Sequence, residues 1–225
     1  MSNDTISMTT LAIDTSTGYL SLAVMSDAKI IARFHRRSHM RHSSLLVPMI
    51  DRLLKKSRMR LKDMDCFAIS IGPGSFTGLR IGVATVKGLA YALDKAIVTV
   101  PTLDVIAQNA KSVKGVICPV LDARKNKVYA CLYRSDGKEI KRISKYLLLP
   151  VKELMEKTAG YDKIFFLGDA LHLIGQHDAG KADWHPRADI VAGLAMEYIR
   201  KKKFTSAEAL EPMYLYSREC DIKGY

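Results

Sequence analysis

The chain has 225 residues, which is enough for one large domain or two small ones. Lysine plus arginine (35 residues) outnumber aspartate plus glutamate (23 residues), and the formal net charge is +12. This excess favours nucleic acid or another anionic partner, although a lysine-rich surface that keeps the protein soluble explains it equally well. There is no bilayer-length apolar run and no basic signal-peptide stretch, so we expect a cytoplasmic protein without a membrane partner.

Three strands are predicted at the start of the chain. Residues 9–14 form an apolar run, and residues 19–25 alternate between apolar and polar side chains. Residues 30–36 follow after a short polar turn. This spacing is typical of an antiparallel meander.

A helix is predicted at residues 42–57, where apolar residues recur at helical spacing. Ser43 or Ser44 can cap it, and Pro48 fits best near its first turn, because a proline deeper in a helix removes a hydrogen bond. The apolar residues cover about 200° of the helical wheel, whereas a one-sided surface helix needs roughly 100°. We therefore expect this helix to be buried on two sides, as in a dimer.

A strand, a glycine-rich turn and a long helix are predicted next, at residues 65–71, 71–75 and 76–93. A further strand at residues 96–100 and a helix at residues 101–111 follow.

The long helix has two distinct stripes. The apolar stripe should face the local sheet, and it consists of Leu79, Val83, Val86, Ala90 and Leu93. The small-residue stripe consists of Gly78, Gly82, Thr85 and Ala92. Because glycine inside a helix costs about 1 kcal/mol relative to alanine, the two glycines indicate that another segment comes close. That segment is either a neighbouring helix of the same chain or another subunit.

Two stretches of the chain share one pattern. Residues 11–29 and 119–138 each contain an apolar strand that ends in aspartate, at Asp14 and Asp122. A polar turn, an alternating strand with a tyrosine, and the sequence Ser-Asp-small-Lys follow in both. We interpret the match as an internal duplication of one βββαβα unit rather than as a coincidence of turn residues.

This duplication predicts an α/β fold. It would consist of two actin-, hexokinase- and Hsp70-like (ribonuclease H-like) domains, each with a mixed sheet and flanking helices. We expect an N-terminal domain at residues 1–105 and a smaller C-terminal domain at residues 106–225, whose last segment packs back on the first domain.

The two turns that grip ATP in that fold are poorly suited to phosphate here. They have the sequences DTSTG and DARKNK, and Gly18 is their single glycine. The stretch IGPGSFTG is not a Walker loop, because Leu79 and Arg80 stand where Lys-Ser or Lys-Thr is needed. We therefore predict no catalytic residue and assign no residue to a cofactor. A sugar-kinase-like ATPase that uses the cleft expected between the two domains remains the alternative.

A histidine cluster and an arginine cluster lie in the first half of the chain. His35, His39 and His42 are close in sequence, but the neighbouring arginines would repel a dication, so we predict no metal site. The arginines are Arg33, Arg36, Arg37 and Arg41. They predict either a solvated surface or a patch that binds tRNA directly, and the second reading is a further alternative function.

Four motifs together resemble the TsaB (YeaZ) family. They are LAIDTS at 11–16, HSSLLVPMI at 42–50, GPGSFTGLRIG at 72–82 and LDARKNKVY at 121–129. The segment EPMYLY at 211–216 is similar to the closing motif of the family, with Tyr216 in place of the usual arginine and Arg218 as its substitute.

The resemblance implies a scaffold rather than an enzyme. Members of the family are non-catalytic paralogues of TsaD, the subunit that transfers a threonylcarbamoyl group to the adenosine next to the tRNA anticodon. The partners implied are TsaD, which holds the metal, and the ATPase TsaE, with tRNA reached through the complex and a homodimer when the protein is alone. No intrinsic cofactor is implied.

The resemblance also implies an interface formed by two helices. Its residues would be Leu46, Met49, Ile50, Phe76, Thr77, Gly78, Gly82 and Thr85. On this basis, Gly82→Arg should abolish pairing with TsaD and leave the fold intact.

Overall fold

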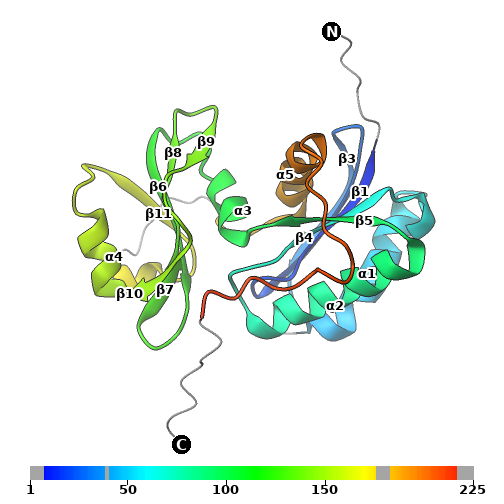
Figure 1. The fold of residues 1–225 in the computed structure, drawn as a ribbon, viewed down its shortest axis with the longest axis horizontal. Coiled ribbons are helices and arrows are strands. Elements are labelled where there is room, and N and C mark those ends of the chain that lie inside the picture. The colour runs from blue at the N-terminus through cyan, green and yellow to red at the C-terminus, as the bar shows by residue number, and fades with distance from the viewer. Residues whose placement is uncertain (1–7, 39–40, 176–182, 217–225) are drawn as a thin grey trace, which may run out of the picture. The chain divides into compact units, whose positions relative to one another are not determined.

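The computed structural model of the chain describes residues 8–38, 41–175 and 183–216 (Figure 1). The chain divides into two compact units, and the first comprises residues 1–105 together with residues 185–212. The second comprises residues 106–184 and the remaining C-terminal residues. Residues 185–212 thus return from the far end of the chain to complete the first unit.

The first unit is built on a five-stranded sheet with the order β3-β2-β1-β4-β5. The strands are β1 (Thr9–Asp14), β2 (Tyr19–Ser26), β3 (Lys29–Arg37), β4 (Cys66–Ser70) and β5 (Ala96–Val100). The first three pair antiparallel, which confirms the predicted meander. Strand β4 runs parallel to β1, and β5 runs parallel to β4.

Helices cover both faces of this sheet. On one face lie α1 (His42–Lys56) and α2 (Phe76–Leu93), packed on large side chains such as Leu11 and Ile13. On the other face lies α5 (Ala188–Arg200), packed on small side chains such as Ala12. Side chains alternate between the faces of a strand, so β1 serves both layers, and its small side lets α5 approach closely.

The structure confirms the predicted apolar stripe of α2. Leu79, Val83, Val86 and Ala90 are buried, and Leu93 is half-buried against the same core. The helix begins at Phe76, as predicted, and the Ser75 hydroxyl at its N-cap accepts a hydrogen bond from the Gly78 amide.

Helix α1 begins differently from the prediction. Arg41 occupies its N-cap without a side-chain cap, and Ser44 Oγ donates to the Arg41 carbonyl instead. Pro48 lies in the second turn of the helix rather than the first. A proline there has no N–H for the Ser44 carbonyl, so packing on the sheet must stabilise the helix against this loss.

The second unit repeats the plan around β6 (Gly115–Asp122). Strands β7, β8, β9 and β10 extend its sheet on one side, and β11 pairs parallel with β6, as β4 does with β1. Their bounds are Lys127–Ala130, Tyr133–Ser135, Ile140–Arg142, Leu147–Pro150 and Ile164–Leu167. Helix α4 (Val151–Thr158) packs beside β10, and α3 (Thr102–Gln108) precedes β6. The fold is therefore the predicted α/β architecture, with a mixed sheet and flanking helices in each of the two units.

Short 3-10 turns at Leu61–Asp63 and Leu171–Ile174 complete the described elements. Of the helices in the described residues, none has the length and apolar content that crossing a membrane requires.

Candidate functional site

The turn after β1 is buried beneath the start of α2. Asp14 and Thr15 are fully buried, and Ser16 and Thr17 are nearly so. Thr15 Oγ1 donates to the Gly78 carbonyl over 2.8 Å. The Ser75 amide donates to the Ser16 carbonyl over 2.7 Å, so the loop before α2 is fastened to the same turn.

The glycines of α2 explain this close approach. A Cβ on Gly78 would collide with the Thr15 carbonyl oxygen, and a Cβ on Gly82 would collide with Thr15 Oγ1. A Cβ on Gly74, in the loop, would collide with the Ser16 carbonyl oxygen. The segment that comes close is therefore the turn after β1 of the same chain, and neither of the two neighbours predicted from the sequence.

This packing corrects the expectation for Gly82→Arg. Gly78 and Gly82 are buried against their own sheet, so they are not available to a partner. An arginine at position 82 would disturb the fold itself, and loss of pairing in that variant would say nothing about an interface.

The carboxyl group of Asp14 is held inside this turn. The Ser16 amide and hydroxyl both donate to Asp14 Oδ1 over 3.0 Å. Burial raises the pKa of Asp14 from 3.8 to about 6, and the nearby Ser70 and Ser16 hydroxyls and the Ser16 amide offset only part of this effect. A carboxyl group without exposed surface is poorly placed to meet a substrate or a metal ion.

The predicted interface residues fall into two classes. Leu46 and Ile50, like the two helix glycines, are buried in the core of the first unit, so they cannot form an exposed contact. Met49 and Thr85 are half-buried, and Phe76 and Thr77 are exposed. For these four residues, contact with a partner stays a prediction.

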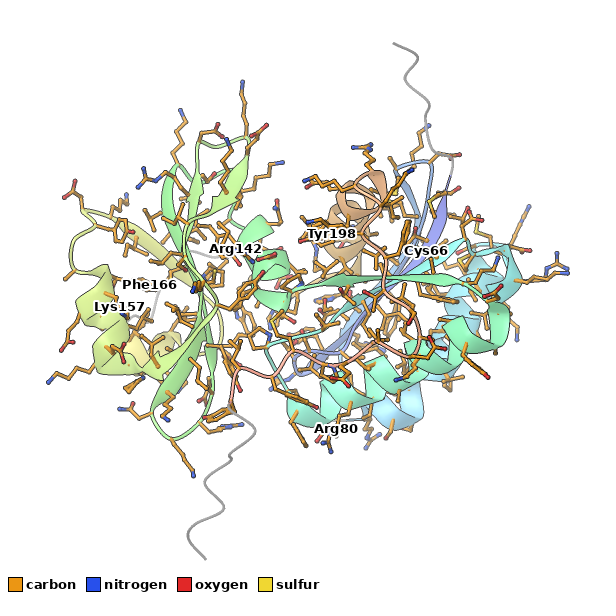
Figure 2. The ribbon with its side chains drawn as sticks, viewed as in Figure 1. Cys66, Arg80, Arg142, Lys157, Phe166 and Tyr198 are labelled. Atoms are coloured by element: carbon orange, nitrogen blue, oxygen red, sulfur yellow. The ribbon has the colours of Figure 1, made fainter. Side chains whose placement is uncertain are left out.

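The list of predicted interface residues omits one exposed apolar residue. Val47 on α1 is 58% exposed, and Phe76 at the start of α2 is 53% exposed. The two helices contact each other. The Arg80 guanidinium lies 3.9 Å from the centroid of the Phe76 ring, on the side of α2 that faces away from the sheet (Figure 2). We call Val47, Met49, Phe76, Thr77 and Thr85 the α1–α2 outer surface.

The equivalent turn of the second unit contains no glycine. Arg124, Lys125 and Asn126 all have positive φ angles, between 51° and 67°, and all three are exposed. The Asp122 carboxylate accepts the Arg124 amide over 2.7 Å and also forms an ion pair with the Arg124 guanidinium. Bulky side chains thus occupy this turn, as its sequence predicted.

Tyr216 is anchored to that turn. Its hydroxyl donates to the Ala123 carbonyl over 2.8 Å, and its ring packs edge-on against Tyr129. The expected substitute Arg218 lies outside the described residues. The tyrosine itself therefore supplies a C-terminal contact in this chain.

We predict that Tyr216→Phe lowers the free energy of unfolding by about 1 kcal/mol, because one hydrogen bond to a partly buried carbonyl is lost. Thermal unfolding would measure the change. Tyr91→Phe is the control, because Tyr91 is 76% exposed. Equal changes in the two variants would contradict the anchoring role.

The arginines of the predicted basic patch lie on both faces of β3 and at the start of α1. All four arginines are exposed, and Arg33 also forms an ion pair with Asp189 over 3.3 Å. Arg33 and Arg37 share one face of β3, and Arg36 lies on the other, because side chains alternate along a strand. Binding of tRNA by these arginines stays a prediction.

Of the three histidines in the predicted cluster, the two that the structure describes make contacts within the fold. His42 is buried and lies within hydrogen-bonding distance of Ser38 Oγ and of the Tyr19 carbonyl. The His35 ring stacks on the Tyr19 ring with centroids 5.0 Å apart. His39 lies outside the described residues. Among the residues that are described, no group of three side chains is arranged to hold a metal ion.

Comparisons with known proteins agree with the motifs. The family model described as "TsaD: tRNA N6-adenosine threonylcarbamoyltransferase" matches residues 33–211. The chain is 32% identical to the tRNA threonylcarbamoyladenosine biosynthesis protein TsaB of Bacillus subtilis, over 96% of this chain and 97% of that protein. It is 34% identical to TsaB of Escherichia coli, over 68% of each chain.

A solved structure shows the same fold. YeaZ from Pseudomonas aeruginosa superimposes with a TM-score of 0.80 and 27% identity, covering 92% of this chain and 100% of that one. The chain belongs to the TsaB (YeaZ) family of tRNA threonylcarbamoyladenosine biosynthesis proteins.

Proposed function

We propose that this chain is a non-catalytic scaffold subunit. It binds and activates TsaD, together with the ATPase TsaE, in the transfer of a threonylcarbamoyl group to the adenosine next to the tRNA anticodon. In this proposal TsaE uses the ATP, TsaD holds the metal, and the complex works in the cytoplasm, where it meets tRNA.

The α1–α2 outer surface is the observation that carries the proposal. Exposed Val47 and Phe76, with half-buried Met49, place apolar side chains on two helices that contact each other. Exposed aromatic and aliphatic residues of this kind are typical anchors of protein interfaces. A partner that covers them gains burial energy without any chemistry in this chain.

The buried turn after β1 supports the non-catalytic part of the proposal. A phosphate-binding turn needs free backbone N–H groups and room for the anion. Here Thr15 and Ser16 lie against Gly78 and Gly74, and Asp14 is enclosed with them. The same packing disfavours the alternative function as a sugar-kinase-like ATPase.

Phe76→Glu tests the surface directly. We expect this variant to bind purified TsaD about 10- to 100-fold more weakly, because an apolar anchor is replaced by a charge. Arg80 lies one helical turn later, so the new carboxylate gains an ion pair and the helix should remain stable. Calorimetry of the wild-type and variant proteins with TsaD would measure the affinities.

Met155→Glu on α4 is the matched control. Met155 is also an exposed apolar residue, but it lies in the second unit and outside the proposed surface. Its variant should bind TsaD within about threefold of wild type. If Phe76→Glu pairs normally with TsaD, this placement of the interface is wrong. Sedimentation of the chain alone would show whether the same surface forms the homodimer.

A further inference from the structure

We propose that the β8–β9 hairpin, defined here as residues 134–145, binds the phosphate backbone of RNA. The inference adds a second contact surface, on the second unit, and it rests on the proposed role in tRNA modification. It concerns a different surface from the one that would pair with TsaD, so the two can fail separately.

Two positively charged side chains lie opposite each other in the hairpin. Arg134 on β8 lies directly opposite Lys141 on β9 in the antiparallel register. Both side chains are exposed, and neither forms an ion pair with a carboxylate within the described part of the chain. Like charges at directly opposed positions destabilise a strand pair. Lys141 is attracted at longer range by Asp136, but no carboxylate stands between the two cations. A local rule broken with so little compensation is expected at functional sites, where a ligand supplies further opposite charge.

The rest of the hairpin also has more positive than negative side chains. The hairpin contains five cations and two carboxylates, and the cations are Arg134, Lys138, Lys141, Arg142 and Lys145. All five are exposed. The Asp136 carboxylate is engaged by the turn, because its Oδ1 accepts the Lys138 and Glu139 amides over 2.8 Å each. Those hydrogen bonds, and to a smaller extent the charge of Lys141, also lower the pKa of Asp136. Of the two carboxylates in the hairpin, that of Glu139 is therefore the one not held by hydrogen bonds from the turn.

The cations lie on both faces of the two-stranded ribbon. Arg142 pairs in register with Tyr133, so its side chain is on the face opposite to Arg134 and Lys141. The Arg142 guanidinium lies 4.4 Å from the centroid of the Tyr146 ring, which restricts its position (Figure 2). Tyr133 and Ser135, on the same face as Arg142, are buried. The face with Arg134 and Lys141 is therefore the one open to a phosphate backbone.

The hairpin does not resemble a protein-binding surface. Ile143, at 40% exposure, is its single exposed large apolar residue, whereas protein interfaces have an apolar or aromatic centre. Charge without an apolar centre is typical of contacts to a nucleic acid backbone. An acidic protein is therefore the less suitable partner, and the test includes it.

The test uses the variant Lys141→Glu, which should raise the thermal stability of the chain and lower its affinity for tRNA. The new glutamate would face Arg134 as an opposite charge, so the melting temperature should rise by about 1–3 °C. Affinity of the full-length chain for a tRNA transcript, measured by fluorescence anisotropy at low salt, should fall at least fivefold. A merely structural role for Lys141 would not separate the two readouts.

The control is Lys152→Glu, which makes the same change of charge at another place on the second unit. Lys152 is exposed near the start of α4, where a glutamate suits the helix dipole. Lys152→Glu should weaken binding to tRNA less than twofold. In the combined variant Lys138→Gln, Lys141→Gln and Lys145→Gln, the slope of log affinity against log salt should fall by about 2, since each phosphate contact contributes about 0.7–0.9.

Three outcomes would overturn the proposal. Equal loss of tRNA affinity in Lys141→Glu and Lys152→Glu would mean that net charge alone is responsible. Poly-glutamate that competes with tRNA at equal charge concentration would point to an acidic protein. Loss of TsaD binding with tRNA affinity unchanged would place the hairpin in a protein interface. Failure of the proposed scaffold role is separate, because it would appear in Phe76→Glu and not in Lys141→Glu.

Discussion

Gly78→Ala is expected to lower the free energy of unfolding by about 3 kcal/mol, although alanine is the better helix former. The added methyl group would collide with the Thr15 carbonyl oxygen, a backbone atom that cannot turn away. Inserting a methyl group into such a packed site costs about 1–3 kcal/mol, and the hydrogen bond from Thr15 Oγ1 to the Gly78 carbonyl would be disturbed as well. Chemical denaturation with a fluorescence or circular dichroism probe would measure the loss.

Gly88→Ala in the same helix provides the control. Gly88 is exposed, and a Cβ at that position meets no atom within 4 Å. Its substitution should stabilise the protein by about 1 kcal/mol, the usual difference in helix propensity. If both glycines respond alike, the close approach of α2 to the turn after β1 is not the reason for glycine at position 78.

Asp14→Asn is expected to stabilise the protein at pH 7.5 by about 2–3 kcal/mol and to have little effect at pH 4. The pKa of Asp14 is about 6 in the folded chain and 3.8 as a free side chain, so the folded state binds the proton more tightly. This contribution to stability is present below pH 3.8 and is lost as the pH rises through 6. A shift of about two pKa units corresponds to about 3 kcal/mol. An asparagine keeps the acceptor for the Ser16 amide and removes the buried charge.

The readout is the difference in unfolding free energy between wild type and Asp14→Asn, measured from pH 4 to pH 8. This difference should grow with pH and level off above about pH 7. Asp162→Asn is the control, because Asp162 is exposed and its replacement should leave the pH profile unchanged. A constant difference across the range would contradict the raised pKa of Asp14.

Much of the fold could be predicted because the relevant signals are local. An apolar run identified β1, alternation of apolar and polar side chains identified β2, and helical spacing identified α2 at its observed bounds. The repeated pattern around Asp14 and Asp122 identified the second unit, because equivalent turns need similar residues. Each of these signals lies within about twenty residues of sequence.

The roles of the glycines and of several apolar residues could not be predicted in the same way. A helical wheel shows that Leu46 and Ile50 are apolar, but it does not distinguish the chain's own sheet from another subunit. The spacing of Gly78 and Gly82 indicated a close neighbour, yet that neighbour is Thr15, more than sixty residues earlier in the chain. Pro48 was misplaced because packing of α1 on the sheet outweighs the missing hydrogen bond. These errors share one cause, which is contact between distant segments.

The return of α5 to the first sheet has a consequence for the order in which the protein can fold on the ribosome. The face of that sheet containing Ala12, Ala23 and Ala68 is covered by Ala192 and Ala195, which are synthesised more than a hundred residues after β4. During translation this face therefore stays uncovered while residues 106–184 of the second unit emerge from the exit tunnel. A nascent chain in that state is a natural client for chaperones that shield apolar surface, and the N-terminal half matures only when the C-terminal half is nearly complete.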